Sequence, residues 1–107
     1  MVRHKVVIVA QALEQLLQIV EYVRENDSES RARIVHDGIV EAIESLLSMP
    51  HRNPVYETRK KTKYSYRYLP KWSFNIIYRV EDDLQVVYVI TIVNAARLRK
   101  NVEANIE

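Results

Sequence analysis

The spacing of the apolar residues changes near Pro54, and this change decides which elements the chain can form. Between residues 11 and 48, apolar residues recur three or four positions apart, which is the spacing of amphipathic helices. Beyond Pro54 they recur at every second position, which is typical of strands. A short β-branched run, "HKVVIVA", precedes the helical region and predicts a strand over residues 5–9.

Two helices are predicted in the first half. The apolar stripe of the first consists of Leu13, Leu16, Leu17, Val20 and Val23. The tripeptide "NDS" at 26–28 ends this helix and supplies N-cap oxygens for the second, which runs to about residue 48 before Pro50 stops it. The stripe of the second helix consists of Ala32, Val35, Ile39, Ala42, Ile43 and Leu46. So short a break predicts an antiparallel helix hairpin, and Gly38 predicts close packing of the second helix on the first or on the sheet.

The second half predicts three or four strands. They cover residues 55–59, 64–69, 74–80 and 84–93, and "EDD" forms a three-residue connection between the last two. The final strand is apolar on both faces over residues 86–90, so we expect it inside the sheet. The helical stripes need a surface to cover, which predicts a two-layer α+β domain: an N-terminal strand, then a helix hairpin on one face of a mainly antiparallel sheet.

The composition predicts one compact domain spanning residues 1–107. The chain has no cysteine, one glycine and no apolar run long enough to cross a membrane, and its N-terminus has too short an apolar core for a signal peptide. We therefore expect a cytoplasmic protein without a membrane partner. No phosphate-binding glycine loop or catalytic triad is present in the sequence, and no cofactor is predicted.

Basic residues are concentrated in the second half of the chain. Residues 1–48 hold 5 Lys or Arg against 8 Asp or Glu, a net charge of −3, and residues 49–107 hold 11 against 6, a net charge of +5. An anionic partner would be drawn to the second half. A solvated basic face is the simpler alternative.

The stretch "YRYLPKWSFNIIYRV" (66–80) interleaves aromatic and basic residues. Strand alternation places Tyr64, Tyr66 and Tyr68 on one face, which we expect to pack on the helices. Arg67 and Arg79 are then expected side by side on the open face. Guanidinium groups there would suit a phosphodiester, whose pentavalent transition state carries extra negative charge. The remaining members of this predicted cationic surface are Arg59, Lys60, Lys61, Lys63, Arg97, Arg99 and Lys100.

The three histidines give little indication of a site. His4, His36 and His51 show no metal-ligand spacing, and "EDD" at 81–83 is interpreted as a turn, so no metal site is predicted. His51 is the one histidine near the basic region, and it is a weak candidate for acid–base chemistry.

The chain resembles the RelE/ParE superfamily of toxins from bacterial type II toxin–antitoxin systems. The likeness lies in "ALEQLLQIVEYV", "IESLLSMPHRNPVYE" and "YRYLPKWSFNIIYRVEDDLQVVYVITIVNAARLRK", in that order along nearly the whole chain. The resemblance implies a growth-inhibiting toxin that a cognate antitoxin wraps and neutralises. RelE-like members cleave mRNA on the ribosome without a metal, whereas ParE-like members inhibit DNA gyrase.

The resemblance also suggests which residues act. The arginine before "LP" corresponds to Arg67, and the arginine after the last strand corresponds to Arg97. Many relatives end that strand with a histidine or tyrosine, where this chain has Asn94. The missing titratable group favours gyrase inhibition. A metal-independent, ribosome-dependent endoribonuclease is the alternative, and an inactive binding domain with the toxin fold is the third possibility.

Overall fold

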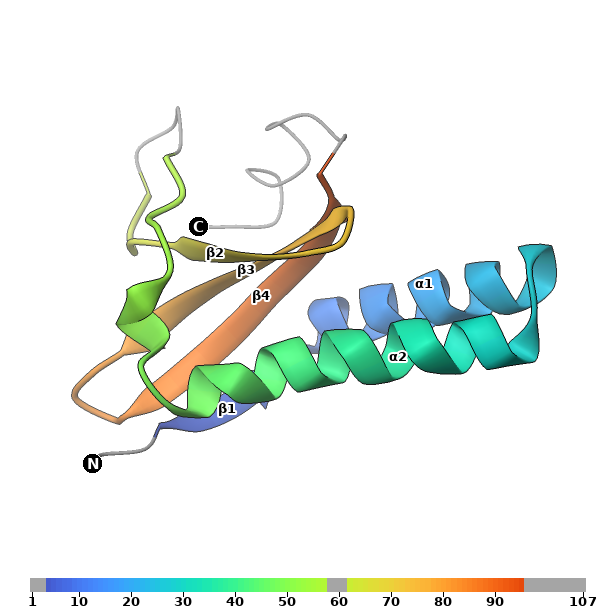
Figure 1. Cartoon of the computed structure of the whole chain (residues 1–107). Helices are drawn as coiled ribbons and strands as arrows, with labels where there is room; N and C mark the ends of the chain where they lie inside the picture. The colour runs from blue at the N-terminus through green and yellow to red at the C-terminus, as the bar shows by residue number, and fades with distance from the viewer. Residues whose placement is uncertain (1–3, 58–61, 96–107) are drawn as a thin grey trace.

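The computed structural model describes residues 4–57 and 62–95, in which two helices lie on one face of a four-stranded sheet (Figure 1). Strand β1 (Lys5–Ile8) leads into helices α1 (Ala10–Asn26) and α2 (Glu29–Glu44). Two 3-10 turns follow, η1 (Ser45–Leu47) and η2 (Pro50–Arg52). Strands β2 (Arg67–Lys71), β3 (Phe74–Glu81) and β4 (Val86–Asn94) complete the sheet. The predicted two-layer α+β architecture is confirmed.

Strand β4 lies inside the sheet, as its two apolar faces predicted. The strand order is β1-β4-β3-β2, with β1 parallel to β4 and the other pairs antiparallel. The register pairs Ile8 with Val89 and Tyr78 with Val89 from the other side. The first and last of the described strands are therefore neighbours, and the helix hairpin connects β1 at one edge of the sheet to β2 at the other edge.

Helix α1 continues the edge of the sheet where β1 ends. Strand β1 pairs only with Val86–Val89, which leaves the rest of β4 without a neighbouring strand on that side. Two glutamines one turn apart on α1 occupy this edge: Gln11 donates to the carbonyl of Ile90 (2.8 Å), and Gln15 accepts from the amide of Ile92 (2.8 Å). The hydroxyl of Thr91 donates to the same Gln15 oxygen (2.9 Å). Side-chain amides thus satisfy backbone groups that a strand would otherwise pair.

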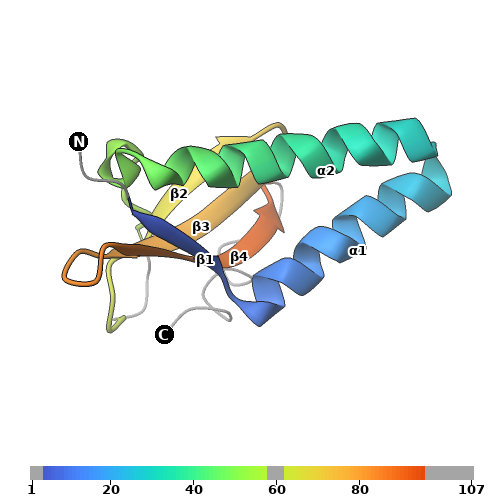
Figure 2. The same cartoon turned by 90° about the horizontal axis from the view of Figure 1, so that it is seen from below.

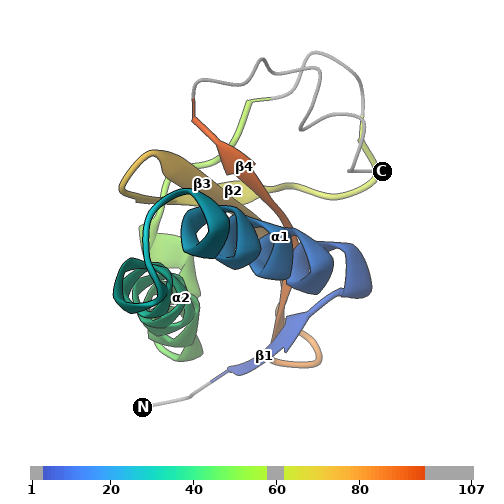
Figure 3. The ribbon, with the colours of Figure 1, turned by 90° about the vertical axis from the view of Figure 1, so that its right-hand side faces the viewer.

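The helix hairpin forms as its sequence predicted. The side chain of Ser28 accepts from the amide of Arg31 (3.1 Å), which caps α2, and Glu29 lies in the first turn, favourable to the helix dipole. Helices α1 and α2 lie against each other and share one side of the sheet, as Figures 2 and 3 show from two directions. Their connecting turn extends beyond the sheet.

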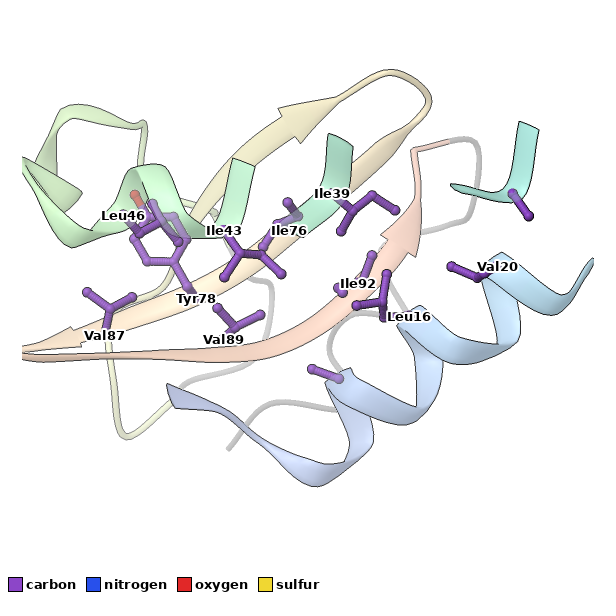
Figure 4. Close-up of a cluster of buried hydrophobic side chains, with 12 residues drawn as sticks. Leu16, Val20, Ile39, Ile43, Leu46, Ile76, Tyr78, Val87, Val89 and Ile92 are labelled. Atoms are coloured by element: carbon purple, nitrogen blue, oxygen red, sulfur yellow. The ribbon is translucent and has the colours of Figure 1, made fainter. Parts of the chain in front are cut away.

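The core lies between the helices and the sheet (Figure 4). The stripe of α2 is confirmed, with Ala32, Ile39 and Ile43 buried, but that of α1 differs from the prediction. The buried residues of α1 are Ala12, Leu16 and Val20, whereas Leu13 and Leu17 are 45% and 56% exposed. Val23 of the predicted stripe is partly buried against the core, whereas Leu13 and Leu17 lie on the outer side of α1.

Strands β2 and β4 begin later than predicted, whereas β3 begins at Phe74 as predicted. The expected strand over residues 55–59 is reduced to one bridge between Val55 and Arg67 within the described residues, and β2 starts at Arg67. The connection between β3 and β4 covers residues 82–85 and is one residue longer than predicted. With no glycine available there, Gln85 takes the left-handed conformation (φ 54°) that closes the turn.

Gly38 is required by the indole of Trp72. A Cβ at Gly38 would lie 2.1 Å from Cη2 of Trp72, so the ring lies directly on the helix backbone. Trp72 belongs to the β2–β3 turn and has a left-handed backbone (φ 52°), which is unfavourable for a large residue. The close approach predicted for Gly38 is present, and its partner is a side chain from the turn.

Replacing Gly38 by alanine is expected to lower the free energy of unfolding by about 1–3 kcal/mol, because the new methyl group displaces the indole. In the background of Trp72→Ala, the same substitution should raise stability by about 1 kcal/mol through helix propensity. Urea denaturation of the four proteins measures both effects. Stabilisation by Gly38→Ala in the presence of Trp72 would contradict this packing.

Gln15→Ala is expected to lower the free energy of unfolding by about 1–3 kcal/mol, because it leaves the Ile92 amide and the Thr91 hydroxyl without their acceptor. Gln18→Ala is the matched control. Gln18 lies on the exposed side of α1 and only donates to Glu14 (3.4 Å), so its loss should change stability by less than about 0.5 kcal/mol. Equal effects of the two substitutions, measured by urea denaturation, would show that Gln15 does not hold the sheet edge.

Candidate functional site

Arg67 and Arg79 lie on opposite faces of the sheet, which corrects the prediction that they share the open face. Directly paired residues of antiparallel strands point to the same side, and Arg67 pairs with Tyr78, which belongs to the core beneath the helices. Arg79 pairs with Tyr88 across the next strand and points to the other side. Alternation within one strand shows which residues share a face. It does not show which side of the sheet that face is on, because this depends on the register with the neighbouring strand.

Arg67 holds the segment that follows α2. Its Nη1 donates to the carbonyl of Asn53 (2.6 Å), and the Asn53 amide donates to the hydroxyl of Tyr78 (3.0 Å). The Tyr78 hydroxyl donates in turn to the carbonyl of Pro50 (2.5 Å). Burial raises the pKa of the Tyr78 phenol, so the group stays protonated as a donor. This network fixes residues 50–53 against the edge of the sheet.

Tyr64, Tyr66 and Tyr68 share one face as predicted, but the face is the one opposite the helices. Tyr66 is buried there against Ile77. The helices cover one side only, so the apolar side chains on the other side are covered by tyrosines. The partly buried residues of this tyrosine face are Tyr56, Tyr64, Tyr68, Ile90 and Val93.

Arg79 is stacked between two tyrosines. Its guanidinium carbon lies 4.0 Å from the ring centre of Tyr64 and 4.4 Å from that of Tyr88. Its Nη1 is 3.4 Å from the carboxylate of Glu81, and its side chain is only 17% exposed. The charge is therefore shared with two aromatic faces and a carboxylate. Tyr64, Arg79 and Tyr88 come from three separate segments of the chain, so their stacking could not be predicted from the spacing of residues.

Few of the predicted cationic residues fall in the described ranges. Lys63 lies over the ring of Tyr64, with its Nζ 5.4 Å from the ring centre. A shallow hollow of about 310 Å³ is lined by Val55, Tyr56, Glu57, Tyr68 and Asn75. The remaining predicted residues, Arg59, Lys60, Lys61, Arg97, Arg99 and Lys100, lie outside the described residues.

An open groove runs between the two helices. It has a volume of about 450 Å³, and Leu17, Val20 and Ala32 supply its apolar surface. Charged side chains surround it, among them Arg24, whose guanidinium contacts Glu21 and Glu29. The exposed Leu17, predicted to be core, thus lines a groove on the surface.

Two of the histidines meet at the opposite end of the molecule. Nε2 of His51 lies 2.8 Å from Oδ1 of Asp82, and Nε2 of His4 lies 3.7 Å from the same oxygen. The hydrogen bond with His51 lowers the pKa of Asp82. Sequence spacing did not group these residues because they come from three segments that only the folded chain brings together.

No helix in the described ranges, residues 4–57 and 62–95, is long and apolar enough to cross a membrane.

The fold is that of known bacterial toxins. The ParDE toxin–antitoxin system of P. aeruginosa has a similar chain, with a TM-score of 0.68 and 16% identity, covering 88% of this chain and 98% of that one. The RelBE2 toxin–antitoxin complex of Mycobacterium tuberculosis gives a TM-score of 0.60 and 17% identity, over 91% and 97% of the two chains. A mutant of E. coli RelE in the free state gives a TM-score of 0.58 and 18% identity, covering 97% of this chain and 94% of that one.

Structural similarity at such low sequence identity shows a shared fold, whereas the family is shown by a match of the sequence to a family model. No curated protein matches the chain. The family model for the ParE toxin of type II toxin–antitoxin systems matches residues 6–99, which include all the described strands and helices except Lys5, the first residue of β1. The chain belongs to the ParE toxin family of type II toxin–antitoxin systems.

Proposed function

We propose that this toxin acts in the ParE mode, by inhibiting DNA gyrase, and that a cognate antitoxin neutralises it. The match to the ParE family over residues 6–99 is the observation that carries the proposal. The gyrase target is what the resemblance of the sequence implies. With these two proposed partners, we propose that the toxin acts in the cytoplasm.

The geometry around the arginines favours this mode over RNA cleavage. A nuclease needs cationic groups converging on one phosphate, together with a base and an acid. Arg67 and Arg79 lie on opposite faces of the sheet, and both are engaged, one with the Asn53 carbonyl and the other between tyrosines. The phenol nearest to the Arg67 network, Tyr78, is buried and donates to Pro50. This arrangement suits a structural role for both arginines.

The tyrosine face is suited to binding a protein. Tyrosine and arginine are enriched at the centres of protein interfaces, and tyrosine buries a large surface with little loss of conformational freedom. Here Arg79 is already fixed between Tyr64 and Tyr88, so little ordering remains on binding. We propose that gyrase contacts this face.

The antitoxin is proposed to dock on the helix hairpin. Leu13 and Leu17 lie one turn apart on α1, both about half exposed, and Leu17 lines the groove against α2. An amphipathic helix from the antitoxin can place apolar side chains on this row. The charged groups around the groove, which include Glu21 and Arg33, offer partners for its polar side.

Expression of the chain without an antitoxin is expected to arrest bacterial growth, and the purified toxin to inhibit supercoiling by gyrase in an assay without ribosomes. In a purified translation mixture, no codon-specific cleavage of mRNA is expected. Growth without any defect, or an inactive toxin in the supercoiling assay, would contradict the proposal.

Cleavage of mRNA in the translation mixture would support the alternative function. In that case Arg67→Ala should lower the cleavage rate by a factor equivalent to about 2–4 kcal/mol of barrier, as for loss of one transition-state charge partner. Circular dichroism of the variant separates this loss from unfolding.

Leu17→Glu is expected to weaken antitoxin binding by about 1.5–3 kcal/mol, because it removes an apolar contact in the groove, while the stability of the free toxin stays nearly unchanged. Isothermal titration measures the affinity, and binding of the wild-type toxin should show a large negative heat-capacity change from coupled folding of the antitoxin.

Leu84→Glu is the matched control for Leu17→Glu. Leu84 is 64% exposed in the β3–β4 turn, away from the helix groove, and its replacement should leave the affinity unchanged. An equal loss in both variants, or a heat-capacity change near zero, would argue against docking of a folding antitoxin segment on the hairpin.

A further inference from the structure

We propose that His4, His51 and Asp82 form a binding site for a zinc-class divalent cation. One ligand atom from each residue lies within 4.8 Å of the others, and both histidines direct Nε2 toward Oδ1 of Asp82. The proposal is independent of the target of the toxin.

The two distances from Asp82 are close to those of a tetrahedral site. Zinc binds histidine nitrogen and aspartate oxygen at about 2.0–2.2 Å, so neighbouring ligand atoms in a tetrahedron lie about 3.3 Å apart. The observed separations from Oδ1, 2.8 Å to His51 and 3.7 Å to His4, lie on either side of this value. The side chain of His51 is 48% exposed, so its ring can rotate toward the ion without disturbing the core.

The backbone that carries the three ligands is held in place. The backbone amide of His4 donates to the carbonyl of Leu47 (2.8 Å). Across η2 the backbone amide of Arg52 donates to the carbonyl of Met49 (3.1 Å), and in the β3–β4 turn the backbone amide of Gln85 donates to the carbonyl of Asp82 (3.1 Å). The site is therefore built on three fixed segments: the residue before β1, η2, and the β3–β4 turn. Fixed carriers lower the entropy cost of collecting the ligands.

The donor set selects the class of metal. Two imidazole nitrogens and one carboxylate oxygen suit zinc, copper and nickel, whereas magnesium and calcium prefer oxygen ligands alone. Three protein ligands with Asp82 65% exposed leave the fourth position of a tetrahedron to water. A cation here would join the β3–β4 turn to the end of the helix hairpin.

The affinity should be moderate. The side chain of His4 is 12% exposed, and its Nδ1 is buried without a hydrogen-bond partner in the described part of the chain. Nε2 is therefore the nitrogen that the ring presents to an ion. Metal-binding histidines usually donate the other N–H to an acceptor, and loss of that acceptor typically weakens binding about 10–100-fold.

The test is isothermal titration of the untagged full chain, freed of metal with a chelator, against zinc chloride. One saturable zinc site is expected, with no binding of magnesium, and zinc should raise the thermal midpoint. His51→Ala and Asp82→Asn should each weaken zinc binding by at least about the 10–100-fold that loss of an outer partner causes. Cobalt in place of zinc should give the visible absorption of a four-coordinate site in the wild type and lose it in both variants.

His36→Ala is the matched control. Nδ1 of His36 lies 2.9 Å from the carboxylate of its neighbour Asp37, so it reproduces an exposed histidine–aspartate pair without a third ligand. This variant should bind zinc as the wild type does. Absence of saturable zinc binding would overturn the proposal, and so would zinc binding that persists in His51→Ala or that falls equally in His36→Ala. Because His51 and Asp82 are exposed, both ligand variants should keep their circular dichroism spectra, which verifies the fold.

Discussion

Backbone pairing along both edges of β4 is the interaction on which the rest of the structure depends. On one side β3 pairs with it along its length, and on the other side β1 covers only Val86–Val89. Gln11 and Gln15 complete that second edge from α1. The position of the helix hairpin is thereby tied to the same strand that forms the floor of the core. Because β1 and β4 are far apart in the chain, this pairing joins the N-terminal strand and the helix hairpin to the C-terminal strands in one unit.

The two faces of the sheet are covered in different ways, and the two predicted site arginines, Arg67 and Arg79, lie on different faces. Helices cover one face, and there Arg67 serves to fix the segment after α2 through the Asn53 carbonyl. Tyrosines cover the other face, and there Arg79 lies between two rings. The basic and aromatic residues of this region thus form an ordered stack in which the guanidinium of Arg79 is shielded from solvent. Such a surface is better suited to shape-specific contact with a protein than to holding a phosphate.

Much of the fold could be predicted from the sequence because helices and hairpins depend on local patterns. The change from helical to strand spacing predicted the layers, the Ser28 cap predicted the start of α2, and the doubly apolar final strand predicted its central place. The side on which a strand's residues face could not be predicted, because it depends on register. Tyr64, Tyr66 and Tyr68 were correctly placed together, but nothing within their own segment shows which layer they meet.

The candidate sites were harder to predict for the same reason. The grouping of His4, His51 and Asp82 depends on the parallel pairing of β1 with β4 and on the position of η2, which are contacts between distant segments. The exposure of Leu17 depends on how α1 lies over the sheet edge. Neither contact produces a recognisable spacing of residues in the sequence. The proposed roles of Arg67 and Arg97 came from the family resemblance, and they remain predictions.

The packing of Trp72 on Gly38 makes the molecule its own optical reporter. The chain contains one tryptophan, and the structure places its indole half exposed on the backbone of α2. Fluorescence of the protein excited at the indole band therefore comes from a single, known position between the helix layer and the β2–β3 turn. Separation of the β2–β3 turn from the helix layer changes the polarity around the indole ring and hence the wavelength of its emission. Their docking can thus be followed in real time in the unlabelled protein.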